Sequence, residues 1–240
     1  VRQHGARRWV KRTAQFSSLA RLTGPGLLAS SESTWLPHRR AAAPAFHHER
    51  LSAVGELVRD AARAGVRSWG DGRSVQIVDV APMGLRVALD VVGRALFSAD
   101  LSSRSERLLA STNEAAQLVV AHARSIVPLP AWAPRPTSLR LRAARRELDR
   151  LCDELVARRR AARGDTHGAD LLGLLIDAGL KDDEIHDELI TMIVAGHETV
   201  AAGLSWALML LAQHQQAQDR VREELGQLPD GVPLSRATQS

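Results

Sequence analysis

The sequence predicts a mainly α-helical protein with a long buried central helix and minimal β structure. Apolar residues recur at helical spacing along most of the chain, most clearly over residues 49–68. Residues 189–212 are apolar nearly all round, which is typical of a helix in the middle of a domain. Only residues 74–78 alternate apolar and polar side chains as a strand does. Because the chain has 240 residues and 45% of them are hydrophobic, we expect a sizeable core in one or two domains.

Helix-starting and helix-ending residues divide the first half of the chain. Thr34 is a candidate N-cap for a helix that begins near Trp35, and this start places Pro37 in the first turn. Pro44 then ends or kinks that helix, and Pro82 begins a later one. The helices expected in this half run over 35–44, 49–68, 82–97 and 103–126.

The second half contains the longest expected helices. Residues 127–137 hold four prolines and are expected to form an apolar loop around Trp132. Ser138 is placed to cap a long basic helix. Three consecutive acids from Asp182 put negative charge at the start of the central helix, which suits its dipole. The helices expected in this half run over 138–163, 169–178, 182–213 and 216–226.

The charge distribution permits two interpretations. The formal net charge of +5 comes from 32 basic and 27 acidic residues, and nearly all of the bases are arginine. A dense run of arginine over residues 135–163 is one way to build a nucleic-acid-binding face. Acids are interleaved with these arginines, as on a solvated helix that carries i, i+4 ion pairs. We favour the solvated helix and keep a basic nucleic-acid-binding helical protein as an alternative.

Cysteine usage and hydropathy bear on the compartment. The single cysteine, Cys152, excludes an internal disulfide and a zinc site built from several cysteines, and it fits a reducing compartment. No run of about 18 apolar residues occurs, so no membrane-spanning segment is expected. The first residues are rich in arginine and lack the apolar core of a signal peptide. We therefore expect a cytoplasmic protein. The chain opens on Val1 rather than Met, so an upstream anchor would lie outside this sequence.

Trp35 and Arg39 form the first candidate site. They stand four residues apart, which places them on one face of a helix. An indole N–H and a guanidinium are hydrogen-bond donors only, so together they suit a carboxylate. Taken alone, the pair is better explained by a packed tryptophan beside a surface arginine.

The second candidate site is the polar cluster Ala195-Gly196-His197-Glu198-Thr199 in the apolar central helix. The Thr199 hydroxyl can donate to the Ala195 carbonyl, which would loosen the helix and leave room for water or a small gas molecule. Glu198 beside it could relay protons as a general acid–base. The alternative is a buried glutamate paired with an arginine and a threonine satisfied by its own helix. For His197 we prefer a packed or exposed histidine that is neither ligand nor base.

This cluster resembles the oxygen-binding signature on the central helix of the cytochrome P450 haem-thiolate monooxygenases. Other segments resemble the same family in order and spacing, and together they extend over nearly all of the chain. They are Gly26-Leu27-Leu28, the Trp-x-x-x-Arg helix with Pro44-Ala45-Phe46, residues 89–100 ending in Leu96-Phe97-Ser98-Ala99-Asp100, Asp170-Leu171-Leu172 and Asp187-Glu188-Leu189. The resemblance implies a partial P450-like helical fold, with residues 1–240 as a single partial domain.

The resemblance also implies a cofactor and a reaction. The protein would be a haem monooxygenase that inserts one oxygen atom from O2 into a small organic substrate. Trp35 and Arg39 would hold a propionate of the haem, which is iron protoporphyrin IX. Ala195 and Gly196 would lie over the haem plane.

Two residues would then serve the chemistry of oxygen. Thr199 would hydrogen-bond the bound dioxygen, and Glu198 would assist proton delivery. Two electrons, ultimately from NAD(P)H, would arrive through a ferredoxin or a flavoprotein reductase. Residues 127–136 would correspond to the mobile lid over the substrate channel.

The sequence departs from the family in one important respect. The family's iron is held by a cysteine thiolate in a Gly-rich loop near the C-terminus, after a Glu-x-x-Arg helix, and neither motif occurs between the central helix and Ser240. Cys152 stands among arginines and acids, and Glu147-Leu148-Asp149-Arg150 precedes the central helix, so we assign neither to those motifs. We expect a central P450 fragment without the axial ligand, inactive alone. A pseudoenzyme or a non-enzymatic helical interaction module is the alternative.

Overall fold

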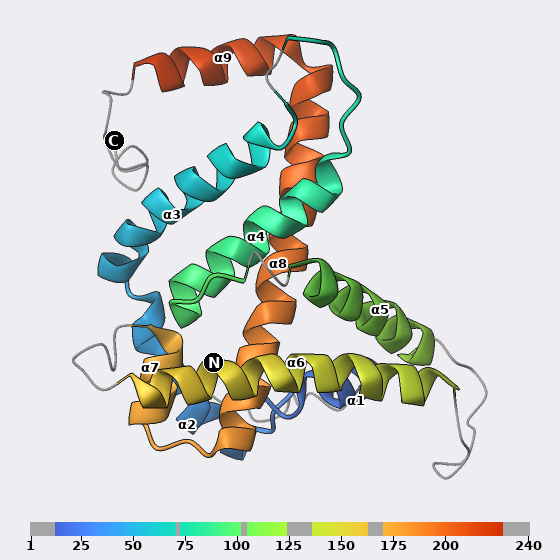
Figure 1. Ribbon diagram of the computed structural model, residues 1–240, viewed down its shortest axis with the longest axis vertical. Coiled ribbons are helices and arrows are strands. Elements are labelled where there is room, and N and C mark those ends of the chain that lie inside the picture. The colour runs from blue at the N-terminus through green and yellow to red at the C-terminus, as the bar shows by residue number, and fades with distance from the viewer. Residues whose placement is uncertain (1–12, 71–72, 102–104, 124–135, 163–169, 228–240) are drawn as a thin grey trace, which may run out of the picture. The chain divides into compact units, whose positions relative to one another are not determined.

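The computed structural model describes residues 13–70, 73–101, 105–123, 136–162 and 170–227 (Figure 1). Within these ranges the regular elements are helices, as predicted. Contacts divide the chain into two compact units, and each contains part of the central helix α8 (Asp182–Gln213). Unit 1 comprises Val1–Ala45 and Ser103–Val194, and unit 2 comprises Phe46–Ser102 and Ala195–Ser240. A single domain over residues 1–240 therefore stays a prediction.

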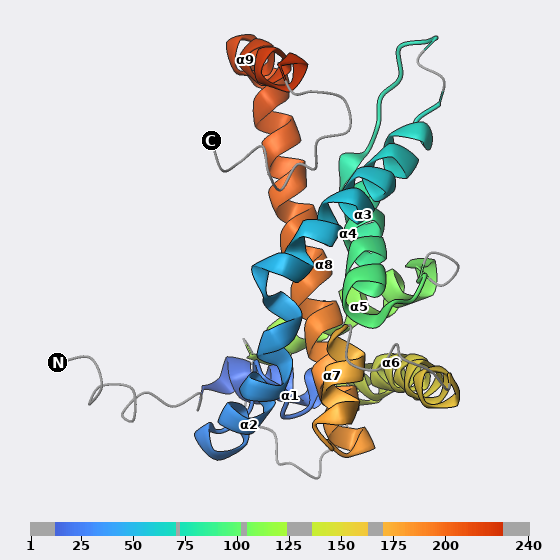
Figure 2. The ribbon, with the colours of Figure 1, turned by 90° about the vertical axis from the view of Figure 1, so that its left-hand side faces the viewer.

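Unit 1 contains residues 182–194 of α8 and five further helices. These are α1 (Ala14–Thr23), α2 (Glu32–Ala42), α5 (Ser105–Ala123), α6 (Pro136–Ala161) and α7 (Leu171–Asp177). α5 packs on α1 and α6, while α7 packs on α2 and α6. Figures 1 and 2 both show α2 and α7 beside the first turns of α8. The core of this unit comes from apolar faces of α6, α7 and α8, where Leu148, Leu175, Ile185, Leu189 and Ile193 are fully buried.

The start of α2 differs from the prediction. The Trp35 N–H donates to the carbonyl of Ser31 at 2.8 Å, so the helix begins at Glu32 and Ser31 is its N-cap. Thr34 lies inside the helix, where its hydroxyl donates to the same carbonyl at 3.2 Å, and the predicted Thr34 cap was wrong. Pro37 consequently lies within the helix rather than in its first turn. The predicted end is confirmed, because Pro44 lies in the short 3-10 helix η2 (Ala43–Phe46) that follows α2.

The start of α6 also differs from the prediction. The helix begins at Pro136, ahead of the expected cap at Ser138. Proline is favoured at the first helical position because its missing N–H would have no partner there. Residues 136 and 137 therefore belong to α6 and not to the expected loop. The rest of that loop, residues 127–135, lies outside the described residues.

Unit 2 contains residues 195–213 of α8 with α3 (His48–Arg67), α4 (Val80–Phe97) and α9 (Gln215–Gly226). The three complete helices match the predicted ones to within about two residues. α3 packs on α4, and a side chain at Gly65 of α3 would meet Met83 and Val87 of α4. Asp79 caps α4 by accepting the Ala81 N–H at 3.1 Å.

The predicted strand over residues 74–78 does not form. The described residues 73–79 carry neither helix nor strand, and the side chains of Val75 and Ile77 are fully exposed. A strand needs a neighbour to pair its backbone N–H and C=O groups. The described part of the chain provides no such neighbour, so the alternation of side chains is not sufficient.

The central helix α8 is buried over only part of its length. Leu189, Ile190 and Ile193 are fully buried, whereas Val200 is 56% exposed and Trp206 is 63% exposed. The expected burial therefore holds for the first half of the helix and not for the second. By length and composition α8 is apolar enough to cross a membrane, which corrects the expectation that no segment is. Core helices of soluble proteins meet the same criterion, so this property is weak evidence for a membrane span.

Candidate functional site

The predicted hydrogen bond of Thr199 is present on α8. Its hydroxyl donates to the Ala195 carbonyl at 2.7 Å. α8 is nevertheless a continuous α-helix through these residues, so the expected loosening is not seen. A carbonyl oxygen has two lone pairs and can accept the hydroxyl in addition to its helical N–H. The hydrogen bond of the hydroxyl is therefore made in addition to the backbone hydrogen bonds of the helix and replaces none of them.

Ala195, Glu198 and Thr199 are all exposed. Their spacing of three and four residues places them on one face of α8. The Glu198 carboxylate is thus solvated, and the alternative of a buried glutamate with an arginine partner does not apply. Toward the C-terminus the same face is apolar and includes the exposed Trp206 and Leu210. The site is a small polar cluster on an open apolar face.

Gly196 and His197 point away from that face. A Cβ at Gly196 would meet Cγ2 of Val92 on α4 at 2.8 Å, so the glycine permits the close approach of α4. One turn further, the backbone of Ala201 lies 3.3 Å from where a Cβ at Gly84 of α4 would stand. His197 is only 2% exposed, so of the packed and the exposed histidine that the sequence left open, the packed one is present. That His197 is neither ligand nor base stays a prediction.

On α2, Trp35 is half-buried and Arg39 is exposed. They lie on one helix face, as the spacing predicted. Arg39 pairs with no acid among the described residues. The Arg39 guanidinium is therefore available for an anionic group, and the indole of Trp35 lies beside it on the same helix. This pair belongs to unit 1 and the α8 cluster to unit 2, so their union in one site is a proposal.

Sequence reasoning missed a buried polar cluster next to the Trp35–Arg39 face. Glu188 of α8 is completely buried. Its Oε1 lies 2.8 Å from Nδ1 of His38 on α2, and its Oε2 accepts the Leu27 N–H at 3.1 Å. Burial raises the pKa of the Glu188 carboxyl, and the hydrogen bonds from His38 and Leu27 partly offset that rise. The signal was an acid seven residues before Ala195, on the same stripe of an apolar helix.

Two other acids that precede the signature also have structural roles. Asp187 of α8 accepts from Arg145 of α6 at 2.7 Å, and Arg145 also donates to the Leu22 carbonyl at 2.7 Å. Desolvation by burial raises the pKa of Asp187, against the lowering effect of Arg145. Asp170 caps α7 through the Gly173 N–H at 2.9 Å and receives both terminal nitrogens of Arg159. These contacts hold α6, α7 and α8 together within unit 1.

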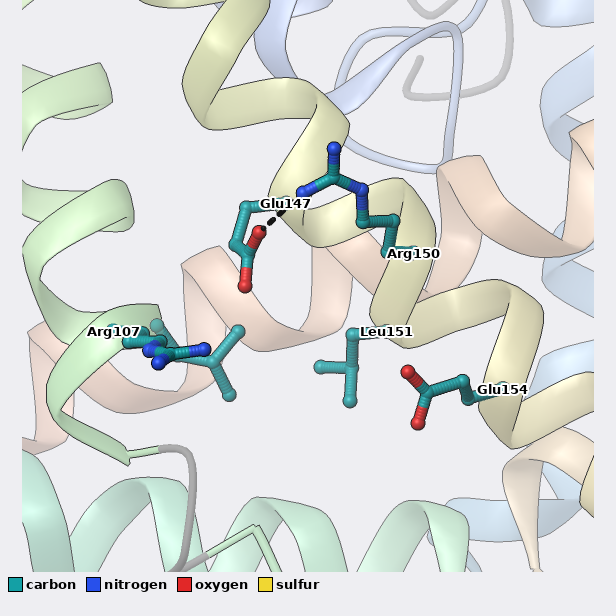
Figure 3. A pocket seen from close by; sticks show the side chains of 6 residues that line it. Arg107, Glu147, Arg150, Leu151 and Glu154 are labelled. Atoms are coloured by element: carbon teal, nitrogen blue, oxygen red, sulfur yellow. Dashed lines mark hydrogen bonds and ion pairs between the residues drawn. The ribbon is translucent and has the colours of Figure 1, made fainter.

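The described residues include a small pocket between α5 and α6 (Figure 3). It has a volume of about 280 Å³, and its lining includes Arg107 of α5. Glu147 and Arg150 form an ion pair of 3.1 Å on one wall, so this Glu-x-x-Arg spacing makes an ordinary surface pair of α6. The pocket is lined mainly by charged side chains and does not include any predicted site residue.

Comparison with known proteins decides the family. A family model described as Cytochrome P450 matches residues 3–232. The chain belongs to the cytochrome P450 family. It is 31% identical over 238 residues to cytochrome P450 72A13 of Arabidopsis thaliana, covering 91% of this chain and 46% of that protein. It is 31% identical to cyclooctat-9-en-7-ol 5-monooxygenase of Streptomyces melanosporofaciens, with 90% and 48% covered. It is 33% identical to putative cytochrome P450 137 of Mycobacterium tuberculosis, with 85% and 44% covered. The chain thus spans about half the length of these P450 relatives.

The residues of this P450 chain fit parts of a haem. The donor-only pair on α2 suits a propionate, because the Arg39 guanidinium has no acid partner among the described residues. The exposed Ala195 and Thr199 leave an open face of α8 with small side chains, against which a flat ring can lie. Cys152 does not fit as an iron ligand, since it is fully buried in α6 and burial raises the pKa of its thiol. Each unit by itself thus fits one part of the group, unit 1 the propionate and unit 2 one face of the ring, and Cys152 does not fit the iron.

Proposed function

We propose that this chain is the central part of a haem-dependent monooxygenase that inserts one oxygen atom from O2 into an organic substrate. The observation that carries the proposal is the Thr199 hydroxyl, hydrogen-bonded to Ala195 beside the exposed Glu198 on an otherwise apolar face. Membership of the P450 family supports it, as do relatives whose names are those of monooxygenases. When bound, haem supplies the iron at which O2 is activated.

The chain's own residues hold the cofactor and move protons. Trp35 and Arg39 donate hydrogen bonds to a propionate and thereby orient the ring. The methyl group of Ala195 is small, so the ring can approach the backbone of α8 closely. Gly196 contributes only its backbone, because the position where its Cβ would stand faces Val92. The two residues lie on the helix that would cover the cofactor.

Protons reach the oxygen site through the two polar side chains of the exposed face. The Thr199 hydroxyl oxygen accepts a hydrogen bond from a water molecule, while its own hydrogen is donated to the Ala195 carbonyl. Glu198 is solvated, so its carboxylate exchanges protons with bulk water and passes them to that position.

Electrons for this reaction come from NAD(P)H through a ferredoxin or a flavoprotein reductase, and we propose a cytoplasmic location. The competing nucleic-acid function is disfavoured by the arginines of α6. Arg145, Arg150, Arg158 and Arg160 each pair with an acid, so much of the basic charge is compensated on the protein itself. A nucleic-acid binder would instead show an affinity that falls steeply with salt concentration.

A carbon monoxide difference spectrum tests the proposed function. The protein extended by its natural downstream sequence, reduced and treated with CO, should absorb at the Soret position of a thiolate-bound haem. A histidine-type spectrum, or none, would reject the proposal. The 240-residue chain alone should show neither thiolate-bound haem nor turnover, because its only cysteine is Cys152. Stoichiometric haem uptake with turnover by that chain would contradict the second expectation.

A further inference from the structure

Glu188 is the most completely buried acid of the described residues, and it faces α2. One carboxylate oxygen contacts Nδ1 of His38, and the other accepts the backbone N–H of Leu27. A buried carboxylate is costly unless each oxygen has a hydrogen-bonding partner. Both oxygens have one here. The geometry of these two contacts therefore defines how α2 and the turn before it lie on α8.

α2 has few other buried attachments. Among its side chains with described burial, only His38 and Ala42 are buried. Ala42 has one methyl group and cannot define an orientation by itself. Leu36, a larger apolar residue of this helix, is 43% exposed. His38 is thus the buried side chain that gives α2 a directional contact with α8: its Nδ1 lies 2.8 Å from Oε1 of the buried Glu188, and its Nε2 lies 3.7 Å from Oε1 of the more exposed Glu184.

His38 lies between Trp35 and Arg39 in sequence and beside their face on the helix. In an α-helix, residues three and four apart share a face, so His38 borders the face of Trp35, and Arg39 is its immediate neighbour. A rotation of α2 about its own axis would move His38 away from Glu188 and turn Trp35 and Arg39 by the same angle. One anchored histidine therefore sets the direction of both donors.

We propose that Glu188 is a positioning residue that fixes the rotation of α2 through His38 and Leu27, and thereby aims Trp35 and Arg39 at their anionic ligand. The identity of that ligand as a haem propionate rests on the proposed function. The positioning itself is a property of unit 1. It can therefore be tested without haem.

Fluorine NMR of the 240-residue chain labelled with 5-fluorotryptophan provides the test. The Trp35 resonance is assigned from its loss in Trp35→Phe. In Glu188→Leu the Trp35 resonance should move or split, because Nδ1 of His38 and the Leu27 N–H both lose the buried carboxylate, and only the longer contact of His38 Nε2 with Glu184 remains. In Glu188→Gln it should stay near its original position, since the side-chain amide offers an oxygen to Leu27 and an N–H to His38. A Trp35 resonance unchanged in Glu188→Leu would overturn the proposal.

Asp187→Asn is the matched control. Asp187 is the residue before Glu188 on α8, it is half-buried, and it pairs with Arg145 of α6 rather than with a residue of α2. This variant should leave the Trp35 resonance in place. The double variant His38→Leu with Glu188→Leu covers the case in which the single variant does not fold, since replacing both partners by apolar groups is often neutral for stability. A wild-type Trp35 resonance in the double variant would also overturn the proposal.

Haem affinity then connects the positioning to the ligand. The chain extended by its natural downstream sequence is titrated with haem and with haem dimethyl ester, which lacks the charged propionates. The wild type should prefer haem by about tenfold or more, as expected for a charge-assisted pair. Glu188→Leu should lose most of this preference, and Asp187→Asn should keep it. If the wild type binds haem no more tightly than the dimethyl ester, this result would reject only the proposed binding of a propionate by Trp35 and Arg39. A preference kept in Glu188→Leu would overturn the positioning role.

Discussion

Replacement of Thr199 by alanine separates the function of the hydroxyl from its contribution to the fold. The bond from the hydroxyl to the Ala195 carbonyl is 2.7 Å long and lies on an exposed face. Such a bond contributes about 0.5–1.5 kcal/mol at most. Alanine is a better helix former than threonine by up to about 0.7 kcal/mol, which offsets this loss. We therefore expect the free energy of unfolding to change by no more than about 1 kcal/mol.

The effect on the reaction should be large. Without the hydroxyl, the water that carries protons to the oxygen site loses its fixed partner, so O2 consumption should become uncoupled from product formation. Thr199→Ser keeps the hydroxyl and should keep the coupling. Ser205→Ala is the matched control, because Ser205 makes the same type of bond to the Ala201 carbonyl at 2.8 Å on the same helix. It should alter neither coupling nor stability by more than a small amount.

Two measurements test this reasoning. Urea denaturation of the 240-residue chain gives the change in the free energy of unfolding. The ratio of product formed to O2 consumed, in the chain extended by its natural downstream sequence, gives the coupling. A loss of stability above about 2 kcal/mol would show that the hydroxyl is mainly structural, since it exceeds one exposed hydrogen bond. Unchanged coupling in Thr199→Ala would remove Thr199 from proton delivery.

Three further predictions concern the described residues. Asp170→Ala removes the cap of α7 and the two hydrogen bonds from the half-buried Arg159, so the free energy of unfolding should fall by about 3 kcal/mol; a loss below about 1 kcal/mol in urea denaturation would contradict this. Burial raises the pKa of Glu188 above its ordinary value of 4.5, so the folded state retains the proton to a higher pH than the unfolded state. The free energy of unfolding of the wild type, minus that of Glu188→Gln, should therefore be highest below pH 4.5 and fall as the pH rises through the folded pKa of Glu188. Urea denaturation over a range of pH measures this difference, and a difference that rises with pH would refute the raised pKa of Glu188. Trp206 is 63% exposed on the apolar part of α8, so Trp206→Glu should reduce self-association of the 240-residue chain, measured by sedimentation velocity; equal association of both proteins would exclude this face.

The helices were predictable from the sequence because their signals are local. The apolar spacing over residues 49–68 and the acids at the start of α8 depend only on neighbours a few residues away. The hydrogen bond of Thr199 was predictable for the same reason, since its acceptor is one turn earlier. The strand predicted at residues 74–78 was wrong, because a strand depends on a partner that the local pattern does not contain.

The sequence by itself determined the helical class, the order of the helices, the two candidate faces and the resemblance to the P450 family. Only the tertiary structure decided which half of α8 is buried, that Gly196 faces α4, and that Glu188 binds His38. The physical reason is the range of the interactions. Helix formation and i, i+4 contacts act within one turn, whereas burial and the pairing of Glu188 with His38 join segments 150 residues apart in the chain.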